Sequence, residues 1–578
     1  GHRWACRRRL DLSSGKRLVP VLLCALLISC GSRAERTPPN EIREFDFSAP
    51  PASAPGAALL QGVTPSIHDA LEALNSAAVD EECKGVFVRV GGFGGAWGRL
   101  TDLGHGLDAI REAGKAVHCH FDATDNAGYA LMAGHCDQIA MTPAGVVDLV
   151  GLAFQVVYLK GLLDHLGVEA NILHVGRFKG AGDMFTEDTM PASAQESLGA
   201  LLDDLDAVFA EALRARNLDH SVVDNGPYTS VPALELNLVD DIVVAGRARS
   251  ALRSSLSNAE VRRVFPPQND QEFSLSSLLL GGDDENDAEA GRRIVLVHVD
   301  GSIVDGTRSR SGQAVSGPFV EALNEFAEDE NVAAIVLRID SPGGSVIASD
   351  VMWNAVREAQ AVKPVIASVG DVAASGGYYI ASAADVIFAH PGSIVGSIGV
   401  VGGKMSFAGL AEQIGVHPET LQRGPNANWS SPLTPFSESQ EVAFQRLLRS
   451  AYYRFVRRVA TGRGRTQSEI LEAAEGRVMS GRQGLERGLI DHPGGLAAAL
   501  AEARLRADDE QGELPIEVWP AAPSPIAALG EALGARATAA YVPALGPLQP
   551  LAEEWLWFPM LLEQESVLAT LPFALRIQ

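Results

Sequence analysis

Residues 340–404 read DSPGGSVIASDVMWNAVREAQAVKPVIASVGDVAASGGYYIASAADVIFAHPGSIVGSIGVVGGK. Apolar runs of strand length alternate in this stretch with one helical segment and with loops of small residues. Ala333–Ile339 and Val365–Val369 are rich in β-branched residues and predict buried strands, whereas Ser345–Ala361 repeats apolar residues at helical spacing. Strands that alternate with helices predict parallel strands joined by crossover helices, which is an α/β fold.

Three loops of small residues interrupt the predicted strands. Ligands of parallel sheets bind beyond the carboxyl ends of the strands, so we expect these loops to meet at one edge of the sheet. The loops are Asp340–Gly344, Ala373–Gly377 and Gly396–Gly399.

Ser375 has two interpretations. As an N-cap it would hydrogen-bond the first turn of a predicted helix, Gly376–Ala384, which is the commonest use of serine before a helix. As a nucleophile it would have the N–H groups of Gly344 and Gly376 as donors to an oxyanion. A nucleophilic serine also needs a base, and the one histidine near the motif is His390. The base is therefore expected from elsewhere in the chain.

Together, the three loops resemble those of signal peptide peptidase A, also called protease IV. The motifs are DSPGG at 340–344, ASGGYY at 374–379 and GSIGV at 396–400, and the resemblance runs from about Leu60 to Leu505. It implies a fold related to Clp protease and crotonase, duplicated in tandem in the long bacterial form. It also implies a Ser–Lys dyad, no cofactor or metal, and a homotetramer.

The first half of the chain is a degenerate copy of the second. Asn126-Ala-Gly-Tyr lies on Ser375-Gly-Gly-Tyr, and Lys179 lies on Ala427 when the segments around Gly176 and Gly424 are aligned. An amide cannot act as the nucleophile, so the first copy lacks the serine while the second lacks the lysine.

The resemblance assigns the general base to Lys179 and the residue that orients its amine to Ser397. The alternative for Lys179 is a solvated loop lysine. A lysine titrates near ~10.4, and bringing its pKa to about 7 requires ~4.6 kcal/mol of disfavour for the charged form. Burial between two domains, with Phe178 and Met184 as apolar neighbours, is expected to supply it.

Composition limits the possible functions. The chain has 578 residues, 46% of them hydrophobic, and a net charge of −25, which predicts two or more domains and disfavours nucleic-acid binding. None of its cysteines has zinc-ligand spacing, and we expect no disulfide framework. These cysteines are Cys6, Cys24, Cys30, Cys83, Cys119 and Cys136.

The N-terminal segment reads as a secretory signal. A basic region precedes Leu18–Ile28, an apolar run too short to span a bilayer comfortably. Leu27-Ile-Ser-Cys30 resembles a lipobox, which implies a lipid anchor on Cys30 and a membrane-bound lipoprotein facing the periplasm. The alternative is an ordinary signal peptide in which Cys30 occurs by chance.

The predicted domain plan follows from the duplication. For the C-terminal extension, an apolar packing segment and a surface that meets lipid or another subunit both stay open. The plan is a signal peptide at 1–29, a tether at 30–58, a lysine-bearing repeat at 59–262, an acidic linker at 263–291, a serine-bearing repeat at 292–508 and the extension at 509–578.

These expectations combine into one function. We expect an envelope serine endopeptidase that degrades cleaved signal peptides and other hydrophobic or unfolded peptides, which it would bind by strand addition. A catalytically silent scaffold of the same fold is the alternative, and a crotonase-like acyl-thioester enzyme is disfavoured by the serine and by secretion.

Overall fold

The computed structural model of this protein describes residues 40–58, 62–267, 291–310, 312–521 and 567–571. The predicted signal peptide and Cys30 lie outside the described residues, as does most of the predicted acidic linker. Residues 40–578 belong to one compact unit.

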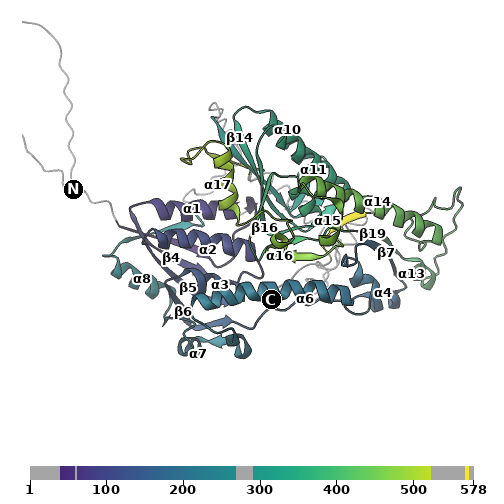
Figure 1. The fold of residues 1–578 in the computed structure, drawn as a ribbon. Helices are drawn as coiled ribbons and strands as arrows, with labels where there is room; N and C mark the ends of the chain where they lie inside the picture. The colour runs from purple at the N-terminus through teal and green to yellow at the C-terminus, as the bar shows by residue number, and fades with distance from the viewer. Residues whose placement is uncertain (1–39, 59–61, 268–290, 311, 522–566, 572–578) are drawn as a thin grey trace, which may run out of the picture. The chain divides into compact units, whose positions relative to one another are not determined.

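The first repeat is built on a largely parallel sheet (Figure 1). Asn126 begins a helix directly after one of the strands of this sheet. In spatial order the strands are β10 (Glu260–Phe265), β1 (Glu41–Phe47), β4 (Cys83–Val90), β5 (Ala116–Asp125), β6 (Gln138–Asp148) and β8 (Tyr228–Thr229), with β9 (Asp241–Ile242) also on β6.

The second repeat has a sheet of matching order, again mostly parallel. Its strands are β20 (Val478–Ser480), β18 (Ile394–Gly396), β16 (Val365–Ala374), β14 (Val332–Ser341), β11 (Arg293–Asp300) and β22 (Ile516–Trp519), with β17 (Val386–Ala389) on β16 and β21 (His492–Pro493) on β17. The α/β fold predicted for the duplicated chain is confirmed.

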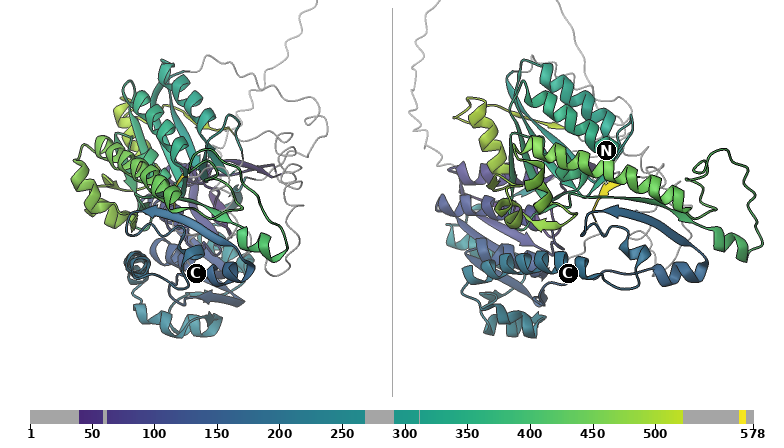
Figure 2. Two further views of the ribbon diagram at one scale, coloured as in Figure 1. Left: turned by 90° about the vertical axis from the view of Figure 1, so that its right-hand side faces the viewer. Right: turned by 45° about the vertical axis from the view of Figure 1, so that its right-hand side comes forward.

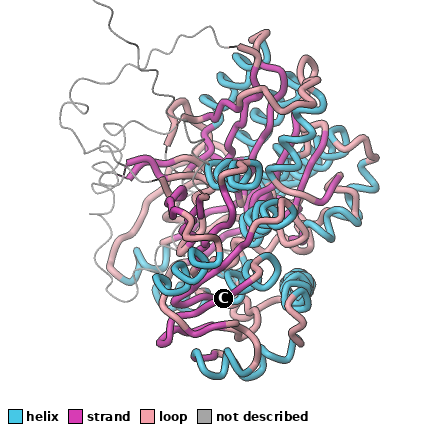
Figure 3. Tube along the Cα trace, turned by 90° about the vertical axis from the view of Figure 1, so that its left-hand side faces the viewer, coloured by secondary structure: helices cyan, strands magenta, loops and turns pink. Residues whose placement is uncertain are grey.

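Helices cover both faces of each sheet (Figure 3). On β14, Ile335 and Leu337 face one apolar cluster and Val336 faces another, because successive side chains of a strand point to opposite faces. One face of the first sheet carries α1 (Ile67–Val79), α2 (Trp97–Glu112), α3 (Asn126–His135) and α6 (Ala192–Ala215), and the other α8 (Ala245–Ser255). The second sheet has α10 (Ser316–Glu328), α11 (Val346–Gln360), α12 (Gly376–Ala381) and α14 (Glu438–Gly462) on one face and α17 (Leu496–Arg506) on the other.

Short elements complete the described chain. The helices among them are α4 (Lys160–Leu166), α5 (Asp183–Thr186), α7 (Ser230–Glu235), α13 (Ala408–Gln413), α15 (Gln467–Ala473), α16 (Gly481–Glu486) and the 3-10 helix His220–Asn225, and β2 (Gly56–Ala58) pairs with β3 (Gly62–Thr64).

A third sheet mixes the two repeats (Figure 2). Within it β7 of the first repeat runs antiparallel to β19 of the second, from Val175 opposite Val400 to Glu169 opposite Ser406. Its strands are β13 (Gln313–Val315), β12 (Ser302–Val304), β15 (Gly343–Ser345), β23 (Val567–Thr570), β19 (Val400–Ser406) and β7 (Glu169–Val175).

Each repeat extends beyond its predicted bounds. The predicted tether, 30–58, contains β1, which pairs with β4 and β10 inside the first sheet. The predicted extension, 509–578, contains β22, which pairs with β11 at the edge of the second sheet, where the first sheet has β10. The predictions of a tether and of a separate extension are therefore wrong over these strands, because each sheet includes a strand from outside the region of resemblance.

The expectation about cysteines is also wrong in one respect. Cys119 on β5 and Cys136, which follows α3, form a disulfide. Cys83 is a free and buried thiol. The parallel neighbours β5 and β6 bring Cys119 beside the chain that leaves α3, a contact that spacing alone does not reveal.

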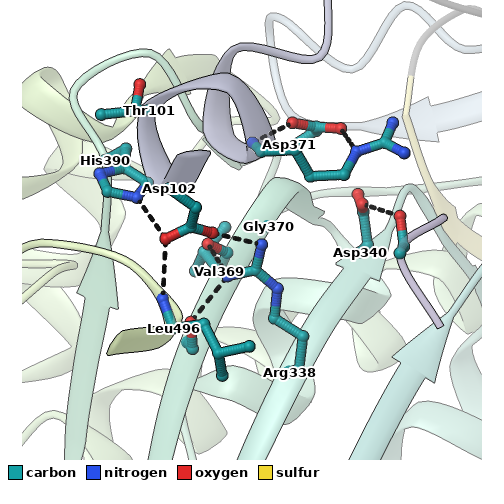
Figure 4. A network of polar contacts seen from close by, with 12 residues as sticks. Thr101, Asp102, Arg338, Asp340, Val369, Gly370, Asp371, His390 and Leu496 are labelled. Atoms are coloured by element: carbon teal, nitrogen blue, oxygen red, sulfur yellow. Dashed lines mark hydrogen bonds and ion pairs between the residues drawn. The ribbon is translucent and has the colours of Figure 1, made fainter. Parts of the chain in front are cut away.

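A buried ionic network joins the repeats (Figure 4). Asp102, on α2 of the first repeat, accepts a hydrogen bond from Arg338 on β14 at 2.7 Å and lies 2.9 Å from Nε2 of His390. It also accepts from the backbone N–H of Leu496 at 3.0 Å. Burial alone would raise the pKa of Asp102, but Arg338 and His390 hold it well below its usual range. The side chains of Asp102 and Arg338 are only 2% and 1% exposed.

We predict that Asp102→Asn strongly destabilises the protein, because it leaves the Arg338 guanidinium buried without a counter-charge. Breaking such a buried pair typically costs about 3–5 kcal/mol, measured as the free energy of unfolding in urea. The matched control is Glu211→Gln, which removes the exposed ion pair between Glu211 and Arg482, also a contact between the repeats. That change is expected to cost no more than about 1 kcal/mol. Equal losses in the two variants would contradict a special role for the buried network.

Candidate active site

Ser375 occupies the turn between β16 and α12. Its backbone has φ 53° and ψ −111°, a strained conformation for a residue with a side chain. The side chain makes no capping hydrogen bond to α12. The N-cap interpretation of Ser375 is therefore wrong, and the hydroxyl is directed to another partner.

Lys179 reaches Ser375 from the first repeat of the same chain. The ladder between β7 and β19 carries the segment after Val175 into the second repeat, where the N–H of Phe178 donates to the carbonyl of Glu475 at 2.7 Å. The lysine stem then passes Gly399 and Gly476, where an added Cβ would lie 3.1 Å from Lys179 Cδ and 2.6 Å from Lys179 Cβ respectively. Only residues without a side chain leave room for it there.

The Lys179 amine meets three oxygen atoms. It lies 2.7 Å from Ser375 Oγ, 2.9 Å from Ser397 Oγ and 3.0 Å from the carbonyl oxygen of Ser397. Lys179, Ser375 and Ser397 are each fully buried. Like Ser375, Ser397 has a positive φ, 52°, which turns both its hydroxyl and its carbonyl toward the amine. The structure thus brings together all three side chains that the sequence predicted for the site.

The amine is favoured in its uncharged form. Burial lowers the pKa of Lys179 well below its usual range, and none of the carboxylates that the structure describes opposes the effect. An uncharged amine has two N–H donors and one lone pair. Its three partners fit that valence, since the two oxygens of Ser397 can accept the N–H groups and the Ser375 hydroxyl can donate to the lone pair.

The predicted oxyanion donors lie beside Ser375. Gly376 is the first residue of α12, and Gly343 and Gly344 form β15 with Ser345. The two loops are in close contact, because a Cβ on Gly343 would lie 2.7 Å from the Gly376 nitrogen. The loop that carries Gly344 therefore lies against the residue that follows Ser375, where an oxyanion site would need it.

The residues that align with Ser375 and Lys179 in the opposite repeats take no part in this site. Asn126, at the turn between β5 and α3, donates to the carbonyl of Gly151 at 2.9 Å and accepts from the N–H of Val150 at 3.1 Å. Ala427, which aligns with Lys179, lies in an exposed loop. His390, the histidine nearest the motif in sequence, is engaged by Asp102 instead.

Sequence reasoning missed a carboxylate cluster behind the oxyanion loop (Figure 4). Asp340 accepts a hydrogen bond from Ser53 Oγ at 2.6 Å and one from the N–H of Val372 at 3.1 Å. Asp371 is clamped by Arg99, whose Nε and backbone N–H donate to it at 2.6 and 2.9 Å. Burial, reinforced by the charge of Asp371, raises the pKa of Asp340 to about 7. The signal available in the sequence was an aspartate ending each of two buried apolar strands.

Known proteins resemble this chain in both repeats. The profile of Peptidase family S49 matches the chain twice, over residues 109–259 and 357–509. The chain belongs to peptidase family S49. The two matched regions fall in the two repeats, so the predicted tandem duplication and the resemblance to signal peptide peptidase A are confirmed.

Relatives in this family are serine proteases. The chain is 30% identical to "Protease 4" of Salmonella typhi over 76% of this chain and 71% of that protein. It is also 30% identical to "Serine protease SPPA, chloroplastic" of Arabidopsis thaliana, over 75% of this chain but only 64% of that relative's length. A solved structure of a ClpP1 mutant from Listeria monocytogenes matches 36% of this chain and 94% of its own, at 16% identity and a TM-score of 0.24.

The described residues contain neither a metal-binding cluster nor a helix that could span a membrane. No cluster of three or more His, Cys, Asp or Glu side chains that could hold a metal ion occurs in the part of the chain that the structure describes. Among the same residues, no helix has both the length and the hydropathy needed to cross a membrane.

We predict that Asp340→Asn stabilises the protein relative to the wild type more strongly as the pH rises. The folded-state pKa of Asp340, about 7, lies above the unfolded value near ~3.9, so the wild type loses folding stability as the pH rises between them. Asparagine keeps the acceptor oxygen but does not ionise. The free energy of unfolding of both proteins, measured in urea from about pH 5 to about pH 8, should diverge across this range. A difference that stays constant with pH would contradict the assignment.

Proposed function

We propose that this member of peptidase family S49 is a serine endopeptidase that uses a Ser375–Lys179 dyad. The observation that carries the proposal is the fully buried Lys179 amine 2.7 Å from the Ser375 hydroxyl. A serine nucleophile needs an adjacent base, and an uncharged amine at this distance is one.

The proposed reaction is acyl transfer to serine followed by hydrolysis. Lys179 takes the Ser375 proton as the oxygen attacks the peptide carbonyl, and the N–H groups of Gly344 and Gly376 receive the developing negative charge. The Lys179 ammonium then protonates the departing amine. A water molecule, activated by the same amine, cleaves the acyl-serine ester. Ser397 holds the amine in the direction of Ser375 throughout.

We propose hydrophobic or unfolded peptides, including cleaved signal peptides, as substrates. The oxyanion loop is itself the strand β15, so a peptide in extended form can pair with it beside Ser375 in the place that β23 takes in this structure. An apolar cluster that contains Met184 and Val401 lies next to this sheet and offers contacts to apolar side chains. A folded protein could not present its backbone in this way.

The cellular setting is proposed from the sequence. A lipid anchor on Cys30, attachment to the envelope membrane facing the periplasm, and a homotetramer stay predictions, since Cys30 lies outside the described residues. Contact with lipid-embedded peptide remnants would be natural for an enzyme tethered in this manner.

The alternative, a silent scaffold, is not favoured. A buried lysine amine without a counter-charge and a strained serine backbone both oppose folding. Selection for folding alone would not preserve these two features in a protein that has no catalytic activity. Activity-dependent labelling of Ser375 with a fluorophosphonate separates the two possibilities, since a scaffold would not react.

We predict distinct losses of activity for the three side chains. Ser375→Ala and Lys179→Met should each reduce kcat/KM on an unstructured apolar peptide by at least about 10³-fold, because each removes a reacting group. Ser397→Ala keeps the carbonyl acceptor and should cost one hydrogen bond, about 3- to 10-fold. Circular dichroism would establish that each variant is folded. A folded Lys179→Met variant with wild-type kcat/KM would refute the dyad.

We also predict the direction of the pH dependence. Activity requires uncharged Lys179, so kcat/KM should rise with pH through the folded-state pKa of this lysine, which burial lowers well below ~10.4. Measurement of kcat/KM across the neutral and alkaline range tests this. An ascending limb with an apparent pKa near 10 would show that the base is a solvated lysine.

A further inference from the structure

A three-residue loop contacts both parts of the site that surround the lysine amine. The loop, residues 475–477, lies between α15 and β20. The carbonyl of Glu475 accepts a hydrogen bond at 2.7 Å from the N–H of Phe178, the residue before the proposed base. The carbonyl of Arg477 accepts one from the N–H of Ser397, also at 2.7 Å. One short loop is therefore bonded both to the segment of the base and to the residue that orients its amine.

The Glu475 side chain adds a second hydrogen bond to the base segment. Its Oε2 accepts from the N–H of Arg177 at 3.0 Å, next to the bond that its carbonyl accepts from Phe178. The hydroxyl of Tyr452, on α14, donates to Oε1 at 3.3 Å and accepts from the N–H of Glu475 at 3.4 Å. The two N–H groups directly before Lys179 are thus bound by one residue, whose carboxylate is itself held by α14.

The backbone of Glu475 is strained. Its φ is 60°, in the left-handed region that favours glycine. Among the described non-glycine residues with a positive φ, Glu475 alone is not asparagine, aspartate or serine, whose short polar side chains tolerate this region better. Strained residues of this kind are concentrated at active sites, where the surrounding contacts hold them. Ser375 and Ser397 share this property, with φ values of 53° and 52°.

The loop and the base segment are packed backbone against backbone. A Cβ added to Gly176 would lie 2.7 Å from the carbonyl carbon of Glu475, and one added to Gly476 would lie 2.6 Å from the backbone nitrogen of Lys179. Glycine at both positions permits this approach. The start of the lysine side chain is therefore set by the position of Glu475, and a shift there would move the amine relative to Ser375.

The outer side of the base segment is covered by different contacts. The Phe178 ring lies between two guanidinium groups, with the Cζ atoms of Arg177 and Arg477 at 4.7 and 3.7 Å from its centroid. Glu196 forms an ion pair at 2.6 Å with each of these arginines. None of these contacts uses the Glu475 carboxylate. We therefore expect the segment to stay folded and covered when that carboxylate is removed.

We infer that Glu475 is a positioning residue for the general base, Lys179. This inference rests on the proposed function. Glu475 fixes the start of the lysine side chain, while the same loop fixes Ser397, so that the amine points at the Ser375 hydroxyl. Proton transfer requires the two atoms within about 2.6–3.2 Å, and they lie 2.7 Å apart. A misplacement of about 1 Å can cost about 10²-fold in rate.

The test compares variants of the full chain in hydrolysis of an unstructured apolar peptide and in the rate of fluorophosphonate labelling. Glu475→Ala should lower kcat about 10- to 100-fold and slow the labelling similarly, with KM within about twofold of the wild type. Glu475→Gln keeps an acceptor oxygen and should stay within about threefold in kcat. The matched control, Glu472→Ala, makes the same change at an exposed position on α15 and should leave both rates unchanged.

A second variant keeps the inference testable should Glu475→Ala fail to fold by circular dichroism. Tyr452→Phe removes only the hydroxyl that holds the carboxylate, and it should lower kcat about 3- to 10-fold, again without a change in KM.

The outcomes separate this inference from the proposed function. If the wild type is labelled and hydrolyses the peptide while folded Glu475→Ala keeps its kcat, the positioning role is refuted and the peptidase stands. A loss confined to KM, or an equal loss of kcat in Glu475→Gln, refutes the positioning role as well. If the wild type shows neither labelling nor hydrolysis, the proposed function fails, and the role of Glu475 fails with it.

Discussion

A lysine amine that is fully buried without a counter-charge is the constraint around which this structure is arranged. Lys179 finds only hydroxyl and carbonyl oxygens, those of Ser375 and Ser397, within hydrogen-bond distance. Removing such a group from water costs free energy, so favourable contacts in the surrounding structure must offset that cost. The ladder between β7 and β19 and the close packing of glycines along the lysine side chain provide such contacts.

The two repeats have different residues, with different contacts, at corresponding turns of the fold. At the turn between β5 and α3, Asn126 satisfies the neighbouring backbone and helps to order a loop. At the matching turn between β16 and α12, Ser375 has a strained backbone and no cap, and its hydroxyl faces the amine. The same junction of the fold thus binds neighbouring backbone in one copy and holds the contact between Ser375 and Lys179 in the other, while the ion pair of Asp102 and Arg338 joins the two copies.

The sequence predicted most of the site because the two copies can be compared with each other. The missing serine in one and the missing lysine in the other pointed to Lys179 across a separation of 196 residues. Local patterns also predicted the central strands, since their apolar runs are long and β-branched. They did not predict the partners of Arg338 or the disulfide of Cys119, which depend on packing between distant segments. The strands β1 and β22 were missed for a similar reason, because their pairing is set by the sheets to which they belong.

Lys179 and Ser375 are 196 residues apart in the sequence, which has a consequence for biosynthesis. A ribosome delivers the amine of Lys179 well before the alcohol of Ser375, and β7 has no partner until β19 has emerged. The nascent polypeptide therefore holds an ordinary protonated lysine and no assembled catalyst. The contact between Lys179 and Ser375 forms only after the later half has been translated, so an unfinished chain lacks it.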